Sequence, residues 1–396
     1  MTPRLSERER LLAAVRGQPV DYVPCAPFFN PLTPEQRLGR RWQFPFGPSE
    51  KEMAEYCVNV LGVGPPVALP IGDYQANFFM SLYYRPHPEV TWRAWVEDGQ
   101  IHKVYRTPAG EIRASVRYDE KWPHGLDVPF WSDFTIGHFT RPWLETEQDL
   151  ECLRYVLRPL DDKDELDRVR FECAEMKAVA DRLGLATIAH VGMGLTGAMQ
   201  LCGAERICMM TLEQPDLVKA YLGLDHQRNM RHMEIACELG ADVIRRNGFY
   251  ETCDFYSPRM LDEFLGPFLR EEIAAVHAAG KPIGYTVNTG VMPMLDYLAS
   301  LDFDCLLHLD MAVEGVDLAK IRDAMAGRKS FWMGPSSVHH MTGDDPELPR
   351  RALRRVFDVF GKQGLIVTPS PSVHSIMPWD NFLAMVDEWK KLTGAQ

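Results

Sequence analysis

Histidine and acidic side chains that could do chemistry follow short apolar segments in the second half of the chain. The candidates are His308, Asp310, His339, His340 and His374. Imidazole and carboxylate groups that converge from several segments can bind a divalent metal such as zinc, and an imidazole beside a carboxylate can act as general acid and base. Because adjacent side chains point in different directions, at most one of the 339/340 pair is expected to serve. The sequence does not choose between His339 and His340, and His340 is carried forward as the candidate.

The elements that must position these residues are eight short apolar runs, each ending in, or directly followed by, Gly, Asn, Asp or Ser. They span residues 23–29, 67–72, 186–192, 242–248, 282–290, 305–310, 330–336 and 364–370. Amphipathic helices separate the later runs, and the clearest is expected as one helix over 257–280, from Ser257-Pro258 to a C-cap at Gly280. Eight strands alternating with helices predict an α/β fold, a parallel (β/α)₈ TIM barrel.

Residues 80–145 break this rhythm. Polar and apolar residues alternate around the turn formers Glu97-Asp98-Gly99 and Pro108-Ala109-Gly110, which predicts antiparallel β-hairpins inserted in the N-terminal third. The aromatic stretch 122–143 is expected to form a pocket wall or an ordered surface loop. No low-complexity linker occurs, so one domain over 1–396 is predicted.

Active sites of such barrels lie at the carboxyl ends of the strands. Side chains alternate along a strand, so His308 and Asp310 share one face while Leu307 and Leu309 share the other. If the leucines pack on outer helices, the histidine and the aspartate point into the barrel mouth. The predicted catalytic residues, which are also the candidate metal ligands, are His308, Asp310, His340 and His374; the predicted substrate-binding residues are Asp73, Tyr74, Asn77, Thr286 and Asn288.

Composition excludes several classes of function. A formal net charge of −12 without a Lys/Arg cluster argues against nucleic-acid binding. No apolar run approaches the roughly 20 residues that span a bilayer, and the first residues read as a charged amphipathic helix, so a cytoplasmic location is expected. Nine cysteines without a CxxC pair are expected to be mostly buried, reduced thiols.

Four stretches in order resemble the uroporphyrinogen decarboxylase superfamily, which includes that decarboxylase and corrinoid-dependent methyltransferases. They read ERERLLAAVRGQPVDYVP, LTGAMQLCGAERICMMTLEQPDLVKAYL, ELGADVIRRNGFYETCDFYSPRMLDEFLGPFLREEIAAVHAAGKPI and GLIVTPSPSVHSIMPWDNFLAMVDEWKKL. The resemblance implies the barrel fold. Barrels of this family often pair, so it also suggests a homodimer.

The sequence departs from both branches at their sites. The decarboxylase has an Arg-rich segment after the first strand, whereas this chain reads NPLTPEQRLGRRWQF. The methyltransferases bind zinc through His-x-Cys after the fifth strand and a Cys after the eighth, where this chain has Thr286, Asn288 and Pro371-Ser372.

The overall pattern is closer to the methyltransferases. The resemblance therefore implies transfer of a methyl group between a small O-, N- or S-methyl compound and a corrinoid on a partner protein, with zinc as a candidate cofactor. Two alternatives stay open: a decarboxylase or lyase acting on a carboxylated substrate, and a non-catalytic ligand-binding barrel.

Overall fold

The computed structural model describes residues 4–30, 44–47, 49–72, 86–119, 122, 124–131, 136–374 and 377–395. Its strands are β1 (Phe29–Asn30), β2 (Val67–Gly72), β3 (Thr91–Glu97), β4 (Gln100–Thr107), β5 (Gly110–Arg117), β6 (Phe139–Arg141), β7 (Thr187–Val191), β8 (Val243–Asn247), β9 (Ile283–Thr286), β10 (Cys305–Leu307), β11 (Ser330–Met333), β12 (Leu365–Val367) and β13 (Val373–His374). Its α-helices are α1 (Glu7–Val15), α3 (Glu50–Tyr56), α4 (Glu147–Val156), α5 (Lys163–Leu183), α6 (Gly194–Cys202), α7 (Ala204–Glu213), α8 (Pro215–Glu238), α9 (Pro258–Phe264), α10 (Gly266–Ala278), α11 (Leu295–Ser300), α12 (Leu318–Met325), α13 (Glu347–Phe360) and α14 (Trp379–Thr393).

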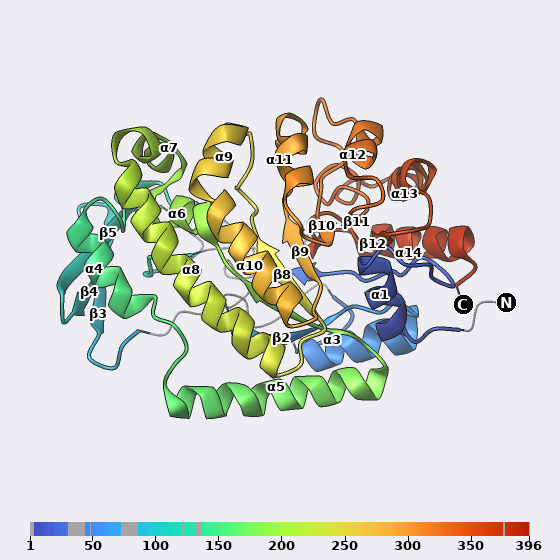
Figure 1. Ribbon diagram of the computed structural model, residues 1–396, viewed down its shortest axis with the longest axis horizontal. Coiled ribbons are helices and arrows are strands. Elements are labelled where there is room, and N and C mark those ends of the chain that lie inside the picture. Colours follow the sequence, from blue (N-terminus) through green and yellow to red (C-terminus); the bar gives the residue numbers. More distant parts are fainter. Residues whose placement is uncertain are drawn as a thin grey trace.

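Seven of the predicted strands form one parallel sheet in the order β12-β11-β10-β9-β8-β7-β2, surrounded by helices (Figure 1). The first predicted segment, 23–29, joins this sheet where it closes. Cys25 forms a parallel bridge with Val367 of β12, and the backbone of Gly64, just before β2, donates to the carbonyl of Cys25 at 3.0 Å. The predicted (β/α)₈ barrel is confirmed.

The barrel interior is filled by one or two apolar side chains from nearly every strand. Phe28, Ile188, Val243, Leu307 and Trp332 pack together there and are almost completely buried. Helix α1 closes the amino-terminal end, because its apolar residues belong to the same cluster. The opposite, carboxyl end of the strands is therefore where polar side chains can gather.

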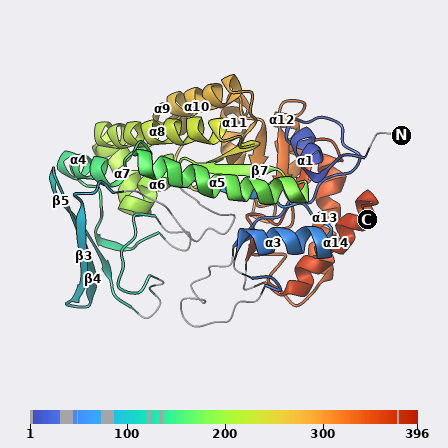
Figure 2. The same cartoon turned by 90° about the horizontal axis from the view of Figure 1, so that it is seen from below.

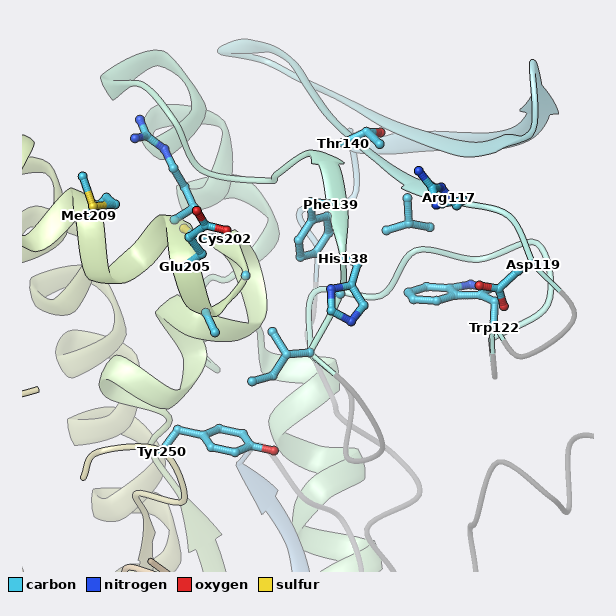
Figure 3. Close-up of a pocket in the computed structure, with 16 residues that line it drawn as sticks. Arg117, Asp119, Trp122, His138, Phe139, Thr140, Cys202, Glu205, Met209 and Tyr250 are labelled. Atoms are coloured by element: carbon cyan, nitrogen blue, oxygen red, sulfur yellow. The ribbon is translucent and has the colours of Figure 1, made fainter. Parts of the chain in front are cut away.

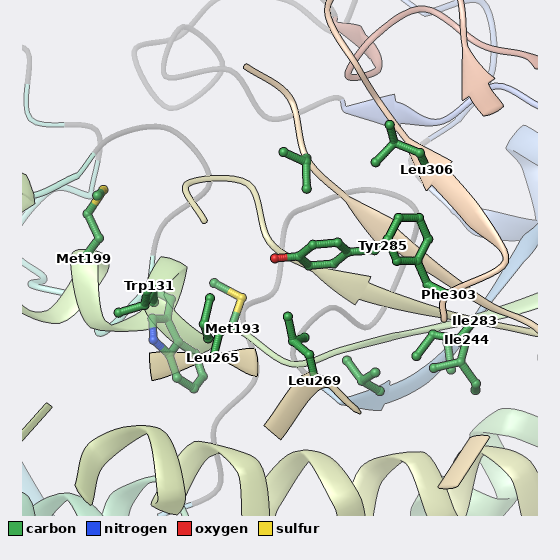
Figure 4. Close-up of a cluster of buried hydrophobic side chains, with 14 of the residues drawn as sticks. Trp131, Met193, Met199, Ile244, Leu265, Leu269, Ile283, Tyr285, Phe303 and Leu306 are labelled. Carbon is green, nitrogen blue, oxygen red and sulfur yellow. The ribbon is translucent and has the colours of Figure 1, made fainter. Parts of the chain in front are cut away.

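A second apolar layer lies between the sheet and the outer helices. Tyr285 and Ile283 of β9 and Ile244 of β8 point outward and meet Leu269 of α10 (Figure 4). Successive side chains on a strand alternate between these two layers. Inward and outward positions can therefore be assigned residue by residue.

The insertion forms a four-stranded antiparallel sheet, β3-β4-β5-β6, at one end of the molecule (Figure 2). Glu97 pairs with Gln100 and Thr107 pairs with Gly110, so both predicted turns close hairpins. The inserted hairpins are confirmed. The count of one domain stays a prediction.

The single helix predicted over 257–280 is wrong, because the structure divides it into α9 and α10 at Leu265. Pro267 explains the break: it has no N–H to donate, and its ring clashes with the carbonyl four residues earlier in a continuous helix. The predicted start is confirmed, since the Ser257 side chain accepts from the backbone of Met260 at 3.2 Å.

The nine cysteines are free, and six of them are buried. Among the described residues, no helix has the length and apolarity that a membrane crossing requires.

Candidate functional site at the carboxyl end of the barrel

Three neighbouring strands end in polar side chains at the same level. Asn247 at the end of β8 pairs with Thr286 at the end of β9, and Thr286 pairs with Leu307, the last residue of β10. His308 follows directly. Asn247, Thr286 and His308 have no exposed surface, so they form a buried polar patch at the barrel mouth.

The backbone at His308 decides where its ring lies. Leu307 packs in the barrel interior and Leu306 in the outer layer, so the predicted outward position of Leu307 is wrong. Strict alternation would then send His308 outward. Instead β10 ends, His308 adopts a left-handed φ of 65°, and its ring lies in the interior with its centroid 4.9 Å from that of Phe28. The inward location of His308 is confirmed, although the reason is a turn.

Several atoms of this patch lack hydrogen-bond partners. Neither ring nitrogen of His308, neither polar atom of the Asn247 amide, nor Oδ1 of Asn288 has a partner within the described part of the chain. Buried polar groups are normally satisfied, because leaving one unpaired costs about 1–3 kcal/mol. Their convergence at adjacent strand ends indicates space for a polar ligand or ordered water.

A buried arginine places a positive charge in the wall of the site. Arg245, two residues before Asn247 on the same face of β8, donates from Nε to Oγ1 of Thr286 at 2.9 Å. Its guanidinium carbon lies 4.8 Å from the ring centroid of Phe28. Burial and the charge of Arg245 hold the pKa of His308 well below its usual value, and the same two causes lower the pKa of His190 on β7. Both imidazoles are therefore neutral near pH 7.

The predicted pairing of His308 with Asp310 is not formed, because neither ring nitrogen of His308 has a partner among the described residues. Asp310 accepts instead from Oγ of Ser336 at 2.8 Å and from the backbone of Ala312 at 2.9 Å. A carboxylate neighbour would raise the pKa of His308, whereas burial and Arg245 lower it. Without the carboxylate as a neighbour, burial dominates.

The structure brings Asp310 and His340 together through Ser336. The backbone N–H of Ser336 donates to Nδ1 of His340 at 2.9 Å while its hydroxyl reaches Asp310. His340 is half-buried, and burial lowers its pKa, whereas the neighbouring His339 is exposed. This agrees with taking His340 as the inward member of the pair.

His374 lies on β13, where it pairs with Asn30 of β1. Its Nε2 is 3.2 Å from Oγ of Ser372, and burial lowers its pKa to about 4. No three His, Cys, Asp or Glu side chains in the described ranges lie close enough together to hold a metal ion. The four predicted metal ligands are thus not gathered into one site.

The predicted substrate-binding residues divide into two groups. Thr286 and Asn288 lie at the barrel mouth, and the backbone carbonyl of Asn288 accepts from Asp310 at 2.8 Å. Asp73, Tyr74 and Asn77 lie outside the described residues.

Sequence reasoning missed Asn247 and Arg245. The signal that could have found them is the run VIRRN in a buried parallel strand, because two adjacent arginines in such a strand must place one charge on each face. Arg246 takes the outer face and pairs with Glu272 at 2.9 Å and Glu251 at 3.3 Å.

Glu251 ties the elements behind the site together. It accepts from the backbone of Leu195 at 3.0 Å and from the Tyr285 hydroxyl at 2.5 Å, and so joins the start of α6 to β8 and β9. Burial raises the pKa of Glu251 to about 7. Gly194 packs against the carboxylate of Glu251, because a Cβ added at this glycine would lie 2.2 Å from Oε1.

A separate cavity of about 1260 Å³ lies between the inserted sheet and α7 (Figure 3). Trp122, Phe139 and Tyr250 contribute aromatic walls, and Arg117 and Glu205 contribute charges. None of the predicted site residues that the structure describes lines it. Tyr250 connects this cavity to the barrel, because Tyr250 follows the end of β8 by three residues.

Comparisons with known proteins agree with this architecture. A methyltransferase from Methanosarcina mazei superposes with a TM-score of 0.61 at 16% identity, covering 98% of this chain and 99% of that one. Two further structures are too distant to carry an argument. One is a 3-keto-D-glucoside 4-epimerase from E. coli, with a TM-score of 0.37 at 16% identity over 61% of this chain and 93% of that one. The other is a B12-independent methionine synthase from Shewanella sp. W3-18-1, with a TM-score of 0.39 at 8% identity over 59% of this chain and 66% of that one. A search of curated proteins gives no match. The sequence profile of the uroporphyrinogen decarboxylase (URO-D) family matches residues 121–392, more than half of the chain, and the chain therefore belongs to that family.

Proposed function

We propose that this protein is a methyltransferase of the corrinoid-dependent demethylase type. It would move a methyl group from a small O-, N- or S-methyl compound to a corrinoid carried by a separate protein. The observation that carries the proposal is the set of buried polar atoms on Asn247, Asn288 and His308 that have no hydrogen-bond partner among the residues the structure describes. The full-length likeness to a protein described as a methyltransferase supports the choice of reaction.

These groups suit a small polar donor. The Asn247 amide and the neutral His308 imidazole each offer donors and an acceptor, and Asn288 adds the acceptor Oδ1. Phe28 supplies an apolar surface beside them. A donor of the form R–X–CH₃ can thus be held by hydrogen bonds to X while its methyl group faces the open end of the barrel.

The corrinoid, when bound, would supply the cobalt that takes the methyl group. As the bond between carbon and X breaks, its electron pair stays on X, which takes a proton from solvent. The N–H groups of Asn247 and His308 stabilise the charge that grows on X, and the positive charge of Arg245 adds to this. Neutral His308 acts as a hydrogen-bond donor, because losing its own proton would create an imidazolate. The four predicted metal ligands do not form a group that fits zinc, so no step is assigned to that metal.

A decarboxylase remains the second candidate because of one observation. Arg245 is a completely buried cation inside the barrel, and a guanidinium is the side chain best suited to a carboxylate. Decarboxylation needs no corrinoid, so the two reactions can be separated by one experiment.

The test is to mix the purified chain with cob(I)alamin and a panel of methanol, methylamines, dimethyl sulfide and methoxybenzoates. Methylcobalamin formation is followed by absorbance. At least one donor should react with the wild type, and Asn247→Ala and His308→Ala should each slow the reaction on the order of 10²-fold, the loss typical of one transition-state hydrogen-bond donor.

The matched control is Leu212→Ala, because Leu212 is 71% exposed on α7 and is not among the residues assigned to the site. Failure of every donor would overturn the proposal. Release of CO₂ from small carboxylic acids without cobalamin would favour the decarboxylase, and ligand-induced thermal stabilisation without turnover would favour a binding barrel.

A further inference from the structure

The carboxylate of Glu251 lies where three elements that lead to the barrel mouth meet. One of its oxygens, Oε1, accepts from the backbone of Leu195 at 3.0 Å and from Nη2 of Arg246 at 3.3 Å. The other, Oε2, accepts from the hydroxyl of Tyr285 at 2.5 Å. Leu195 belongs to α6, Arg246 to β8 and Tyr285 to β9, so a single buried side chain joins the three elements.

Two of these contacts act on residues that adjoin the site. Arg246 precedes Asn247 and donates from Nη1 to its backbone carbonyl, and Tyr285 precedes Thr286, which pairs with Asn247 across the two strands. The side-chain amide of Asn247 has no partner among the described residues, so its place depends on the backbone that carries it. Glu251 therefore acts on the site through Arg246 and Tyr285, from the outer layer of the barrel.

The carboxylate is closely surrounded by backbone. A Cβ added at Gly194 would lie 2.2 Å from Oε1, and one added at Gly248 would lie 2.7 Å from Oε2. Glu251 itself has no exposed surface. A change in its hydrogen bonds must therefore be taken up by its bonded partners, because the carboxylate has no free space to move into.

The ionised and protonated forms of Glu251 differ in how they hold these partners. Oε1 faces the N–H groups of Leu195 and Arg246, which have no lone pair to accept a proton. A proton on the carboxyl group therefore lies on Oε2 and donates to the hydroxyl of Tyr285. The hydrogen of that hydroxyl then turns away from Glu251, and the charge that attracts Arg246 is lost.

Charged and titratable groups from the surrounding elements act on this carboxylate. They are Arg246 on β8, Tyr285 on β9, Asp225 on α8, Glu272 on α10, Tyr297 on α11 and Tyr256 before α9. Burial raises the pKa of Glu251 to about 7, against the lowering effects of Arg246 and of the hydrogen bond from Tyr285. Both forms of Glu251 are therefore populated near neutral pH.

We propose that Glu251 is a positioning residue for the site at the barrel mouth. Its ionised carboxylate holds Asn247 and Thr286 in place through Arg246 and Tyr285, and its protonation slows the reaction there. The inference rests on the proposed methyl transfer and deepens it, because it names the group that regulates that site.

The pH dependence of methyl transfer tests this role, with a donor that reacts in the panel above. Glu251→Gln copies the protonated form, since its amide nitrogen donates to Tyr285. At pH 8 the variant should have a kcat about tenfold below that of the wild type, the size of one hydrogen bond to a charged group, with little change in KM. The ratio of the two kcat values should approach one at pH 5.5, whereas a merely structural loss would keep it constant.

A second variant moves the midpoint of this change. Tyr285→Phe removes a hydrogen bond that lowers the pKa of Glu251, so the fall in kcat should begin at a higher pH than in the wild type. Tyr297→Phe is the matched control, because the Tyr297 hydroxyl donates to the carbonyl of Leu261 at 3.4 Å. A midpoint that Tyr285→Phe leaves in place, or that both variants shift equally, would overturn the proposal.

Nuclear magnetic resonance separates this inference from the proposed reaction. In protein labelled with ¹⁵N at asparagine, the backbone amide signal of Asn247, assigned with Asn247→Asp, should shift with a midpoint near pH 7 in the wild type and stay fixed in Glu251→Gln. If no donor reacts but this signal titrates, the methyl transfer is wrong and the positioning role stands. A signal that is flat in the wild type, or a kcat ratio that does not change with pH, would refute the positioning role.

Discussion

The ring of His308 reaches the interior of the barrel only because one backbone angle is unusual. A non-glycine residue in the left-handed region is disfavoured by roughly 1–2 kcal/mol. Here that conformation turns the imidazole back toward Phe28 at the point where β10 ends. The position of a candidate functional side chain is thus set by a local backbone conformation that hydrophobic alternation does not predict.

Replacing His308 separates this backbone effect from the loss of the ring. His308→Gly and His308→Ala both remove the imidazole, but only glycine adopts the left-handed φ without penalty. We expect the glycine variant to have the larger free energy of unfolding, by about 1 kcal/mol, in urea denaturation. Equal stabilities would mean that the backbone relaxes in the alanine variant.

Among the elements, α6 depends on a close approach at its first residue. Gly194 has a φ of 49°, and an added Cβ would lie 2.2 Å from Glu251 and 2.5 Å from Arg246. These two side chains form part of the buried network behind the barrel mouth. A glycine at position 194 is therefore explained by packing against an internal ion pair.

Gly194→Ala should lower the free energy of unfolding by roughly 2 kcal/mol or more, because the methyl group displaces a buried carboxylate and the backbone is strained. Gly223→Ala is the matched control. Gly223 lies within α8 and has no atom within 4 Å of an added Cβ, so this change should stabilise the chain by up to about 1 kcal/mol. Thermal unfolding of both variants would measure the contrast, and similar losses in the two would contradict it.

The sequence predicts elements better than it predicts the site. The run VALPIG matches β2, and the turns at 97–99 and 108–110 close the hairpins, because apolar runs and turn formers act locally. The division at Pro267 and the turn at His308 also have local causes, but they interrupt a pattern that otherwise continues.

The contents of the site depend on which distant side chains meet. The carboxylate of Asp310 accepts a hydrogen bond from Ser336, 26 residues away, and His308 therefore has Arg245 rather than Asp310 as its charged neighbour. Neither neighbour can be read from spacing along the chain. Arg245 was visible only as an unexplained charge in an apolar strand.

For the molecule as a whole, two kinds of buried titratable group give opposite dependences of stability on pH. His190, His308 and His374 have lowered pKa values in the folded chain. As the pH drops below about 6.5 the unfolded chain therefore binds protons at these histidines more readily than the folded chain, and stability falls.

Glu251 has a raised pKa of about 7, so its ionised form is disfavoured in the fold, and stability rises as the pH falls from 7 toward 4.5. Arg246, Tyr285, Glu272 and Asp225 are the charged or titratable groups that act on it.

Glu251→Gln removes the second effect and leaves the histidines. Between pH 7.5 and 5.5, the melting temperature should therefore fall more steeply in the variant than in the wild type. Differential scanning calorimetry at several pH values measures both slopes. Parallel slopes would mean that Glu251 stays ionised throughout this range.

The closing seam of the barrel has a consequence for how the chain folds. Phe28 donates its backbone N–H to Oγ1 of Thr368 across 340 residues, and the bridge from Cys25 to Val367 spans almost the same distance. Contacts between such remote segments form slowly, because a very long loop must close before they are made. During synthesis, residues 23–30 lack the partners on one of their two sides until the ribosome has passed β12 and β13. For most of its translation the nascent chain therefore has an open barrel with unpaired strand edges. During this interval those edges can pair wrongly with neighbouring chains.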